Sequence, residues 1–376
     1  MSGGVDSSLS AALLVEAGYD VTGVYMKNWS QNLPGMECPW AEDLADAKRV
    51  AVQLGIPFKV FDFEKDYKHL VVDYMIREYS AGRTPNPDIM CNQEVKFGLF
   101  LQAALEDGAD MIATGHYAQT AHHDDSFLPS EPNVSAENLS VNLEKSPKDS
   151  RGSRVPKNES VGMSQLVRAV DTNKDQTYFL YRVTSEALSK TVFPIGHLKK
   201  PEVRVEAEKR GLLTATRRDS QGICFVGNVG IREFLSQYIK TESGDIVERE
   251  TGKKLGTHDG AIFYTFGQRH NLGVGGGLPY YVVGKDMDKN EVYVSSNLNS
   301  EEFWRDELKL SGIHWINEIP ASEKKYQVRL RHRAPLINCM IEDNVIKLDS
   351  PERAIAPGQS AVVYDGKTVL GGGIVL

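Results

Sequence analysis

The sequence predicts an α/β protein in which a doubly wound parallel sheet is followed by a small central β-rich domain and a C-terminal β-barrel. Segments of strand character alternate with segments of helical periodicity up to about residue 114, as in parallel sheets with helical crossovers. From Gly244 the chain changes to short strands and turns, and from about Glu301 it alternates and reaches an Asp365-Gly366 hairpin turn. We expect domains at residues 1–225, 226–298 and 299–376.

Length and composition fit this plan and exclude several classes of protein. A chain of 376 residues accommodates two or three domains, and 41% hydrophobic residues are enough for a sizeable core. The net charge of −8 argues against a protein that coats nucleic acid nonspecifically, so any contact with RNA must come from local basic patches. No run of about 18 apolar residues occurs, so we expect no membrane partner.

The first expected element is a glycine-rich turn that opens a helix, with the sequence SGGVDSS from Ser2. Its glycines permit close approach and positive φ, and the helix ends near Gly18. Free N–H groups at a helix start suit a phosphate, with an ordinary capped turn as the alternative. The lysine of a Walker A loop is absent, so cleavage at a γ-phosphate is not expected. Such a loop normally follows a buried strand, and only Met1 precedes Ser2, so we expect the sheet to lack its first strand.

The remaining elements of the first domain follow in order. We expect strands at 19–26, 58–63 and 111–114, and helices at 42–54, 69–79, 93–105 and 200–210. Ligands bind at the carboxyl ends of parallel strands, which places Met26, Gly115 and the glycine-rich turn on one rim. From about 121 to 164 the chain is rich in Ser, Asn, Glu, Pro and Lys, which predicts a flexible insertion.

The four cysteines, Cys38, Cys91, Cys224 and Cys339, are far apart and form no C-x-x-C pair. They predict neither a disulfide framework nor a zinc site, and we expect no metal site built by the protein. Cys38 and Cys339 are assigned to structure. The other two have settings that favour a reactive thiol.

Cys91 follows a proline-containing loop and is expected at the start of the next helix, where the dipole favours a thiolate. Asp88, three residues earlier, could take or give a proton. Cys224 follows Arg217 and Arg218, which could stabilise a thiolate or a persulfide. Burial as a small hydrophobic side chain is the alternative for both cysteines.

A third candidate site is the stretch from Tyr326 to Arg333, which alternates strictly. Arg329, Arg331 and Arg333 are therefore expected on one face of a strand. This basic face either contacts phosphate or is only solvated, and the sequence favours neither interpretation.

Seven motifs together resemble those of the tRNA-specific 2-thiouridylases, in that family's order and over nearly the whole chain outside the insertion. They are SGGVDSS from Ser2, MKNW from Met26, GRTPNPDIMCN from Gly82, ATGHYA from Ala113, NKDQTYFLY from Asn173, DSQGICF from Asp219 and YTFGQRHNLGVGG from Tyr264. The first also resembles the PP-loop of the N-type ATP pyrophosphatases. The resemblance implies a HUP-like PP-loop domain, a central linking domain and a C-terminal β-barrel that helps hold the anticodon arm of a tRNA.

The resemblance also implies a reaction. ATP, with Mg²⁺ to neutralise the pyrophosphate, adenylates O2 of the wobble uridine in a tRNA anticodon, and sulfur from a persulfide replaces the activated oxygen. Cys224 would hold the persulfide, Cys91 would release its sulfur through a Cys91–Cys224 disulfide, and Asp88 would act as acid/base. The residues implied for ATP are Ser2, Gly3, Gly4, Val5, Asp6, Ser7, Met26 and Gly115. Asn86, Pro87 and Asp88 are implied for the target base, and Lys174, Asp175, Gln176, Arg331 and His332 for the rest of the tRNA.

Partners and location follow from the same resemblance. A cysteine desulfurase or a sulfur-relay protein would donate the persulfide. The insertion is foreign to compact bacterial members and favours a mitochondrial protein, with a bacterial cytoplasm as the alternative. Two other functions stay open: a PP-loop amidating synthetase, which would need an ammonia source and neither thiol, and an inactive tRNA-binding truncation of the same family.

Overall fold

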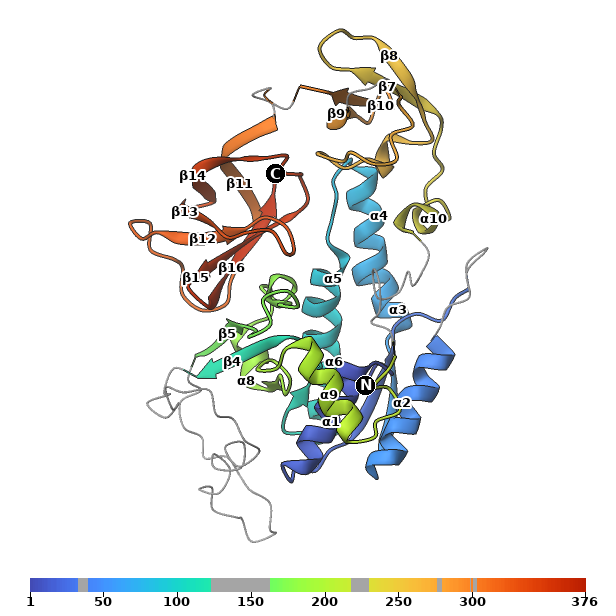
Figure 1. Ribbon diagram of the computed structural model, residues 1–376, viewed down its shortest axis with the longest axis vertical. Coiled ribbons are helices and arrows are strands. Elements are labelled where there is room, and N and C mark those ends of the chain that lie inside the picture. The colour runs from blue at the N-terminus through green and yellow to red at the C-terminus, as the bar shows by residue number, and fades with distance from the viewer. Residues whose placement is uncertain (33–39, 123–162, 218–229, 276–278, 298, 300–302) are drawn as a thin grey trace.

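The computed structural model describes residues 1–32, 40–122, 163–217, 230–275, 279–297, 299 and 303–376 (Figure 1). Cys38, Arg218, Cys224 and most of the predicted insertion lie outside the described residues. The helical elements are α1 (Val5–Glu16), α2 (Trp40–Leu54), α3 (Glu64–Tyr67), η1 (Lys68–Val72), α4 (Asp73–Ser80), α5 (Pro87–Met90), η2 (Cys91–Leu99), α6 (Phe100–Glu106), η3 (Thr177–Phe179), α8 (Ser185–Ser189), α9 (Lys200–Lys209), α10 (Ile231–Leu235) and η4 (Ala261–Phe263). The strands are β1 (Gly23–Lys27), β2 (Phe58–Asp62), β3 (Ile112–Ala113), β4 (Ala118–His122), β5 (Ser164–Arg168), β6 (Thr191–Val192), β7 (Gly244–Glu248), β8 (Lys254–His258), β9 (Tyr281–Asp286), β10 (Glu291–Ser295), β11 (Trp304–Trp315), β12 (Tyr326–Arg329), β13 (Ile337–Glu342), β14 (Val345–Arg353), β15 (Ser360–Asp365) and β16 (Thr368–Val375).

The N-terminal region has the predicted α/β organisation. β1 pairs in parallel with β2, and β3 pairs in parallel with β6. The apolar face of α1, with Leu9 and Ala12, is buried in one cluster with Val203 and Ala207 of α9. This packing fixes the start of α1 beside the start of a helix nearly 200 positions further along the chain (Figure 1).

The strand predicted at 19–26 begins only at Gly23, because the preceding residues cap α1. Gly18 has a φ of +83°, its N–H donates to the Val15 carbonyl at 3.0 Å, and the Tyr19 N–H donates to the Leu14 carbonyl at 3.1 Å. This is a Schellman cap, which uses the backbone that a longer strand would need.

Two predicted helices begin earlier than expected. The helix predicted at 69–79 is a continuous run from Glu64 to Ser80, and the one predicted at 93–105 runs from Pro87 to Glu106. Each contains a π-helical stretch, η1 or η2. The second change matters for the site, because it moves Cys91 away from the helix start.

The central and C-terminal regions form the predicted β-rich module and barrel. The central sheet has the order β8-β7-β10-β9, in which only the pair β7–β10 is parallel. The barrel consists of β11, β14, β13, β12, β15 and β16, and pairing of β16 with β11 closes the ring. Its interior is an apolar cluster that includes Val328, Cys339 and Ile346. In Figure 1 the central sheet lies at the top and the barrel on the left.

Strands β4 and β5 extend the sheet of the barrel, although they precede residue 299. β4 and β5 form an antiparallel pair, and β5 continues onto β16, with Val167 opposite Thr368. Residues 121, 122 and 164, expected within the insertion, therefore belong to strands. Among the residues described, none of the helices has the length and apolar character needed to cross a bilayer.

Candidate active site

The glycine-rich turn forms at the start of α1, as predicted. Gly3 has a φ of +73°, whereas Gly4 caps the helix with a φ of −92°. The Ser2 N–H donates to Ser7 Oγ at 3.1 Å, which closes the turn. A Cβ on Gly3 would lie 2.5 Å from the Asp43 carbonyl oxygen, so glycine alone fits there. The turn thus presents helix N–H groups and serine hydroxyls together, a setting that suits phosphate.

Gly115 lies directly against this turn. A Cβ on Gly115 would lie 2.7 Å from both the carbonyl carbon of Asp6 and the nitrogen of Ser7. Met26 lies one residue before the end of β1 and is partly buried against the apolar cluster around Phe100. Gly115 is therefore in close contact with the backbone of the turn, whereas a shared rim that includes Met26 stays a prediction.

Two residues, Tyr117 and Lys200, hold Asp6, and the second of them was missed from the sequence. Lys200 Nζ lies 2.7 Å from Asp6 Oδ1 and 2.9 Å from Oδ2, and the Tyr117 hydroxyl donates to Oδ1 at 2.8 Å. The Lys200 side chain is 10% exposed, although lysine is rarely buried without a partner. Tyr117 lies within a recognised motif, but Lys200 is 194 positions from Asp6 and no pattern near it points there.

The loop at 82–86, which precedes α5, is held by the barrel and by the central region. The Thr84 N–H donates to the Pro357 carbonyl at 3.0 Å, and Gln359 Nε2 donates to the Thr84 carbonyl at 2.7 Å. The Thr84 hydroxyl lies 3.1 Å from that of Thr265. A Cβ on Gly358 would approach the Thr84 nitrogen to 2.8 Å. Two distant parts of the chain, residues 357–359 and Thr265, therefore fix the entry to the helix that carries Asp88 and Cys91.

Cys91 does not lie at the start of a helix, so that prediction is wrong. Asn86 is the N-cap, Pro87 the first helical residue and Asp88 the second, which leaves Cys91 in the second turn. The dipole acts mainly within the first turn. Cys91 is 1% exposed, in an apolar cluster with Trp29 and Val95. Cys91 therefore has the buried, apolar surroundings of the alternative interpretation. It lies three residues after Asp88 in the same helical run.

Of the other cysteines and the two arginines that precede Cys224, the structure describes Cys339 and Arg217. Cys224 and Arg218 lie outside the described residues, so the separation of the two predicted reactive thiols is not observed. Arg217 Nη2 lies 2.5 Å from Asp43 Oδ1, so this arginine is paired with a carboxylate of α2. Cys339 is fully buried in the barrel, and burial raises its thiol pKa to about 12, which agrees with a structural assignment.

Two segments that carry residues predicted to contact tRNA meet in the structure, although they are distant in the sequence. Arg333 Nε donates to the Asn173 carbonyl at 3.1 Å, and the His332 ring lies 4.6 Å from that of Phe179. Asp175, however, is 1% exposed and is paired with the buried Arg329 and the partly buried Arg168, which favours a structural role. Gln176 Oε1 accepts the Tyr117 N–H at 2.9 Å and so supports the segment that contacts Asp6.

The expected row of three arginines is wrong. β12 ends at Arg329, and residues 330–333 form a turn in which Arg333 has a φ of +64°. Arg329 is 5% exposed, whereas Arg331 and Arg333 are exposed. β12 thus ends at Arg329, whose guanidinium is paired with the buried Asp175 carboxylate, and the chain then turns.

Two histidines, His116 and His332, are held in the neutral form. Burial, together with the charge of Lys96, lowers the pKa of His116 well below its usual value, and the ring is packed against Phe97 and Phe193. Burial, with the neighbouring Arg333 and Arg329, lowers the pKa of His332. At neutral pH His332 therefore offers a flat uncharged ring beside arginine side chains.

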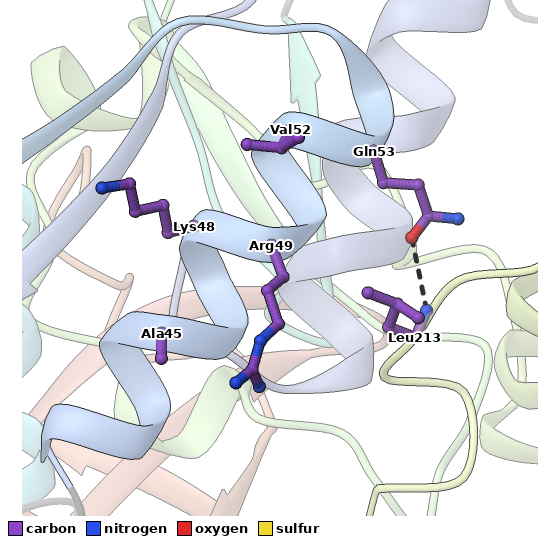
Figure 2. A pocket seen from close by; sticks show the side chains of 6 residues that line it. All are labelled: Ala45, Lys48, Arg49, Val52, Gln53 and Leu213. Atoms are coloured by element: carbon purple, nitrogen blue, oxygen red, sulfur yellow. Dashed lines mark hydrogen bonds between the residues drawn. The ribbon is translucent and has the colours of Figure 1, made fainter.

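A groove of about 590 Å³ lies elsewhere, between α2 and the segment after α9 (Figure 2). It is lined by Ala45, Lys48, Arg49, Val52, Gln53 and Leu213. Gln53 lies across it and accepts the Leu213 N–H at 3.4 Å. None of the predicted site residues lines this groove.

Comparison with known proteins identifies the three regions. Residues 1–228 match the family described as tRNA methyl transferase HUP domain, residues 232–296 the tRNA methyl transferase PRC-barrel domain, and residues 305–375 the aminomethyltransferase beta-barrel domain. These matches agree with the predicted fold class, an α/β domain followed by two β-rich domains.

Curated relatives match over the full length. The chain is 42% identical to a protein named tRNA-specific 2-thiouridylase MnmA from Streptococcus sanguinis (strain SK36), over 100% of this chain and 93% of the relative. Identity is also 42% to the protein of that name from Bacillus cytotoxicus, and 41% to that from Bacillus thuringiensis (strain Al Hakam), with the same coverage. Since identity of this level extends over the whole chain, the chain belongs to the family of tRNA-specific 2-thiouridylases.

Proposed function

We propose that the protein is an ATP-dependent tRNA-uridine 2-sulfurtransferase, which adenylates O2 of the wobble uridine in tRNA anticodons and replaces that oxygen with sulfur. The observation that carries the proposal is the full-length similarity to tRNA-specific 2-thiouridylases. The reaction consumes ATP and releases AMP and pyrophosphate. Such chemistry suits a phosphate loop that lacks the lysine of a Walker A motif.

ATP binds at the rim formed by residues 2–7 and Gly115, with Met26 contributing from the end of β1. The close packing of Gly115 on the turn supports this assignment. Mg²⁺ would neutralise the pyrophosphate as it leaves. In the part of the chain that the structure describes, no group of three or more His, Cys, Asp or Glu could hold a metal ion. Phosphate oxygens of the nucleotide would therefore supply many of its ligands.

The anticodon arm of the tRNA binds across Lys174, Arg331 and His332, where two distant segments meet. Asp175 and Gln176 support this surface from within, by their contacts with Arg329 and Tyr117. The target uridine turns out of its stack to reach the reaction centre, as a base must when chemistry occurs on it. At the start of α5, Asn86 and Pro87 contact the base, and Asp88 acts as acid/base.

Sulfur comes from a persulfide on Cys224, loaded by a donor such as a cysteine desulfurase or a sulfur-relay protein. The Cys91 thiolate attacks Sγ of Cys224, and the S–S bond of the persulfide breaks. Its terminal sulfur leaves with the electron pair, attacks C2 of the adenylated uridine and displaces AMP. A Cys91–Cys224 disulfide remains, which a thiol reductant converts back to two thiols. Cys91 is buried here, so the reaction requires that it become accessible.

Thiolation of unmodified tRNA tests this proposal directly. The protein is incubated with tRNA, ATP, Mg²⁺ and a labelled persulfide donor, and 2-thiouridine is measured after digestion of the RNA. Cys91→Ser and Cys224→Ser should each abolish thiolation and leave tRNA binding intact, while Cys339→Ala serves as the control. Pyrophosphate release without thiolation would indicate an amidating synthetase. Retention of tRNA with neither activity would indicate an inactive binding protein.

The place of the reaction in the cell stays a prediction. The relatives named above come from bacteria, which fits the alternative of a bacterial cytoplasm and gives no support to a mitochondrial location. Fractionation of the source cells, with the protein detected by antibody, distinguishes the two.

A further inference from the structure

The contact between Lys200 and Asp6 places a second charged residue beside the phosphate loop. We propose that Lys200 is a positioning residue for ATP: it neutralises and orients the Asp6 carboxylate, so that the loop can receive the polyphosphate. This inference rests on the proposed function, because it takes ATP as the ligand of the loop. It adds a residue from α9, far along the chain, to the machinery of the turn.

Without a positive charge beside it, the Asp6 carboxylate would repel the phosphates of a nucleotide bound at the loop. Asp6 is the second residue of α1, so its carboxylate lies in the turn where phosphate oxygens are expected. Negative charges in a partly desolvated site repel each other strongly. The carboxylate is 32% exposed, so water screens it only in part. A positive charge at hydrogen-bond distance removes most of this repulsion.

The geometry of the pair also fixes the direction of the carboxylate. Lys200 Nζ contacts both oxygens, and the Tyr117 hydroxyl donates to Oδ1 as well. Three donated hydrogen bonds from α9 and the segment after β3 hold Asp6 toward those elements. The Asp6 carboxylate is thereby directed to Lys200 and Tyr117, while within the turn the Ser7 and Ser8 hydroxyls donate to the Gly4 carbonyl.

Lys200 is itself rigidly placed. Its backbone N–H donates to Asp171 Oδ2 at 2.8 Å, and its ammonium lies 5.8 Å from the centre of the Tyr117 ring. Tyr117 is fixed in turn by Gln176. The Tyr117 N–H donates to Gln176 Oε1 at 2.9 Å, and the Gln176 N–H donates to the Tyr117 carbonyl at 3.0 Å. A flexible surface lysine would lose more entropy on pairing than one held in this way.

A purely structural bridge between α1 and α9 is the competing interpretation. It predicts that loss of Lys200 lowers the melting temperature but leaves nucleotide affinity unchanged in the folded protein. The positioning role predicts that affinity falls because of an uncompensated carboxylate. Removing that carboxylate as well should then restore part of the affinity.

The test uses the full chain and the probe α,β-methylene-ATP with Mg²⁺, whose binding is measured by calorimetry without tRNA. Lys200→Met should weaken binding by about tenfold or more, and Lys200→Arg by about threefold or less, since Arg keeps the charge. The double variant Lys200→Met/Asp6→Asn should bind more tightly than Lys200→Met alone. Lys209→Met is the matched control on the same helix, because that side chain is 64% exposed and paired only near the surface; its affinity should not change.

Several results would overturn the inference. If wild type and Lys200→Met bind the nucleotide with equal affinity, the contact between Lys200 and Asp6 has only a structural role. A double variant as weak as Lys200→Met would mean that Lys200 does not act through Asp6. If Lys200→Met does not fold, weak binding by a folded Lys200→Arg would contradict the role of charge, whereas wild-type affinity would support it. No binding by the wild type would overturn the proposed function together with this inference, which distinguishes the two failures.

Discussion

Asp175 and Arg329 form a buried ion pair that joins the N-terminal region to the barrel. Arg329 Nη1 lies 3.3 Å from Asp175 Oδ2, and Arg168 Nε lies 2.9 Å from the same oxygen. The other oxygen accepts hydrogen bonds from the backbone and the hydroxyl of Thr177. One carboxylate therefore links β5, β12 and the segment that leads into η3.

Asp175→Asn should destabilise the fold, because it leaves two largely buried guanidinium groups without a counter-charge. Breaking such a pair by removing one partner costs about 3–5 kcal/mol. Urea denaturation with a spectroscopic probe measures the free energy of unfolding. Glu342→Gln is the control, since its partner Lys347 and its own side chain are half exposed, and a loss of at most about 1 kcal/mol is expected. Equal effects of the two changes would contradict the role given to Asp175.

Gly115→Ala should abolish ATP binding at a modest cost in stability. The new methyl group would meet the backbone between Asp6 and Ser7 at 2.7 Å, so the phosphate turn would have to move. Calorimetry with α,β-methylene-ATP measures the effect. Gly256→Ala is the control, because nothing lies within 4 Å of its Cβ position. Unchanged nucleotide affinity in Gly115→Ala would show that the turn does not hold the phosphates.

Arg331→Ala should weaken tRNA binding and leave ATP binding unchanged. Arg331 is exposed in the turn after β12, next to His332. Loss of one phosphate contact should lower the slope of log affinity against log salt by about one. Filter binding at several salt concentrations measures this slope. Lys325→Ala removes an exposed cation just before β12 that is paired with Asp349, and should leave the slope almost unchanged; a similar loss in both variants would argue against a specific surface.

Lys285 should make stability depend on pH in the alkaline range. Burial lowers its pKa from 10.5 to about 8, and its ammonium donates to the Tyr264 carbonyl at 2.7 Å. Between about pH 8 and 10.5 the unfolded chain keeps a proton that the folded chain has lost. Unfolding then takes up a proton, so the free energy of unfolding should rise with pH, by up to about 3 kcal/mol in total.

The measurement for Lys285 compares wild type with Lys285→Met by urea denaturation at pH 7.5, 9 and 10.5. The rise should be smaller in the variant, because the buried ammonium is gone. Lys289→Met, which removes an exposed lysine of the following turn, should behave like the wild type. Parallel curves for the wild type and Lys285→Met would show that Lys285 does not titrate in this range.

Local features of the site could be predicted from the sequence. The turn before α1 depends on adjacent glycines and serines, and its conformation follows from residues within seven positions. Strand and helix alternation likewise predicted the parallel pairing and placed Gly115 near the turn. In such cases the determining contacts are close in the sequence, or they follow from the topology of a parallel sheet.

Features that depend on tertiary contacts could not be predicted. The alternation predicted one strand face with Arg329, Arg331 and Arg333, but β12 ends at Arg329 and the chain then turns, while Arg329 is paired with a buried carboxylate from another region. The prediction for Cys91 is wrong because the helix begins at Pro87, before the position that the sequence pattern indicates. No pattern near Lys200 indicates its contact with Asp6, because Asp6 lies 194 positions away, at the other end of the N-terminal region.

The contacts with Thr84 allow the last twenty residues of the chain to affect a helix that lies outside the barrel. Pro357, Gly358 and Gln359 hold the backbone that leads into the helix of Asp88 and Cys91. A substitution such as Gly358→Val could leave the protein abundant and yet misplace the reacting groups. In a genetic screen, alleles at this position would resemble substitutions of Asp88 or Cys91 although they lie in the barrel.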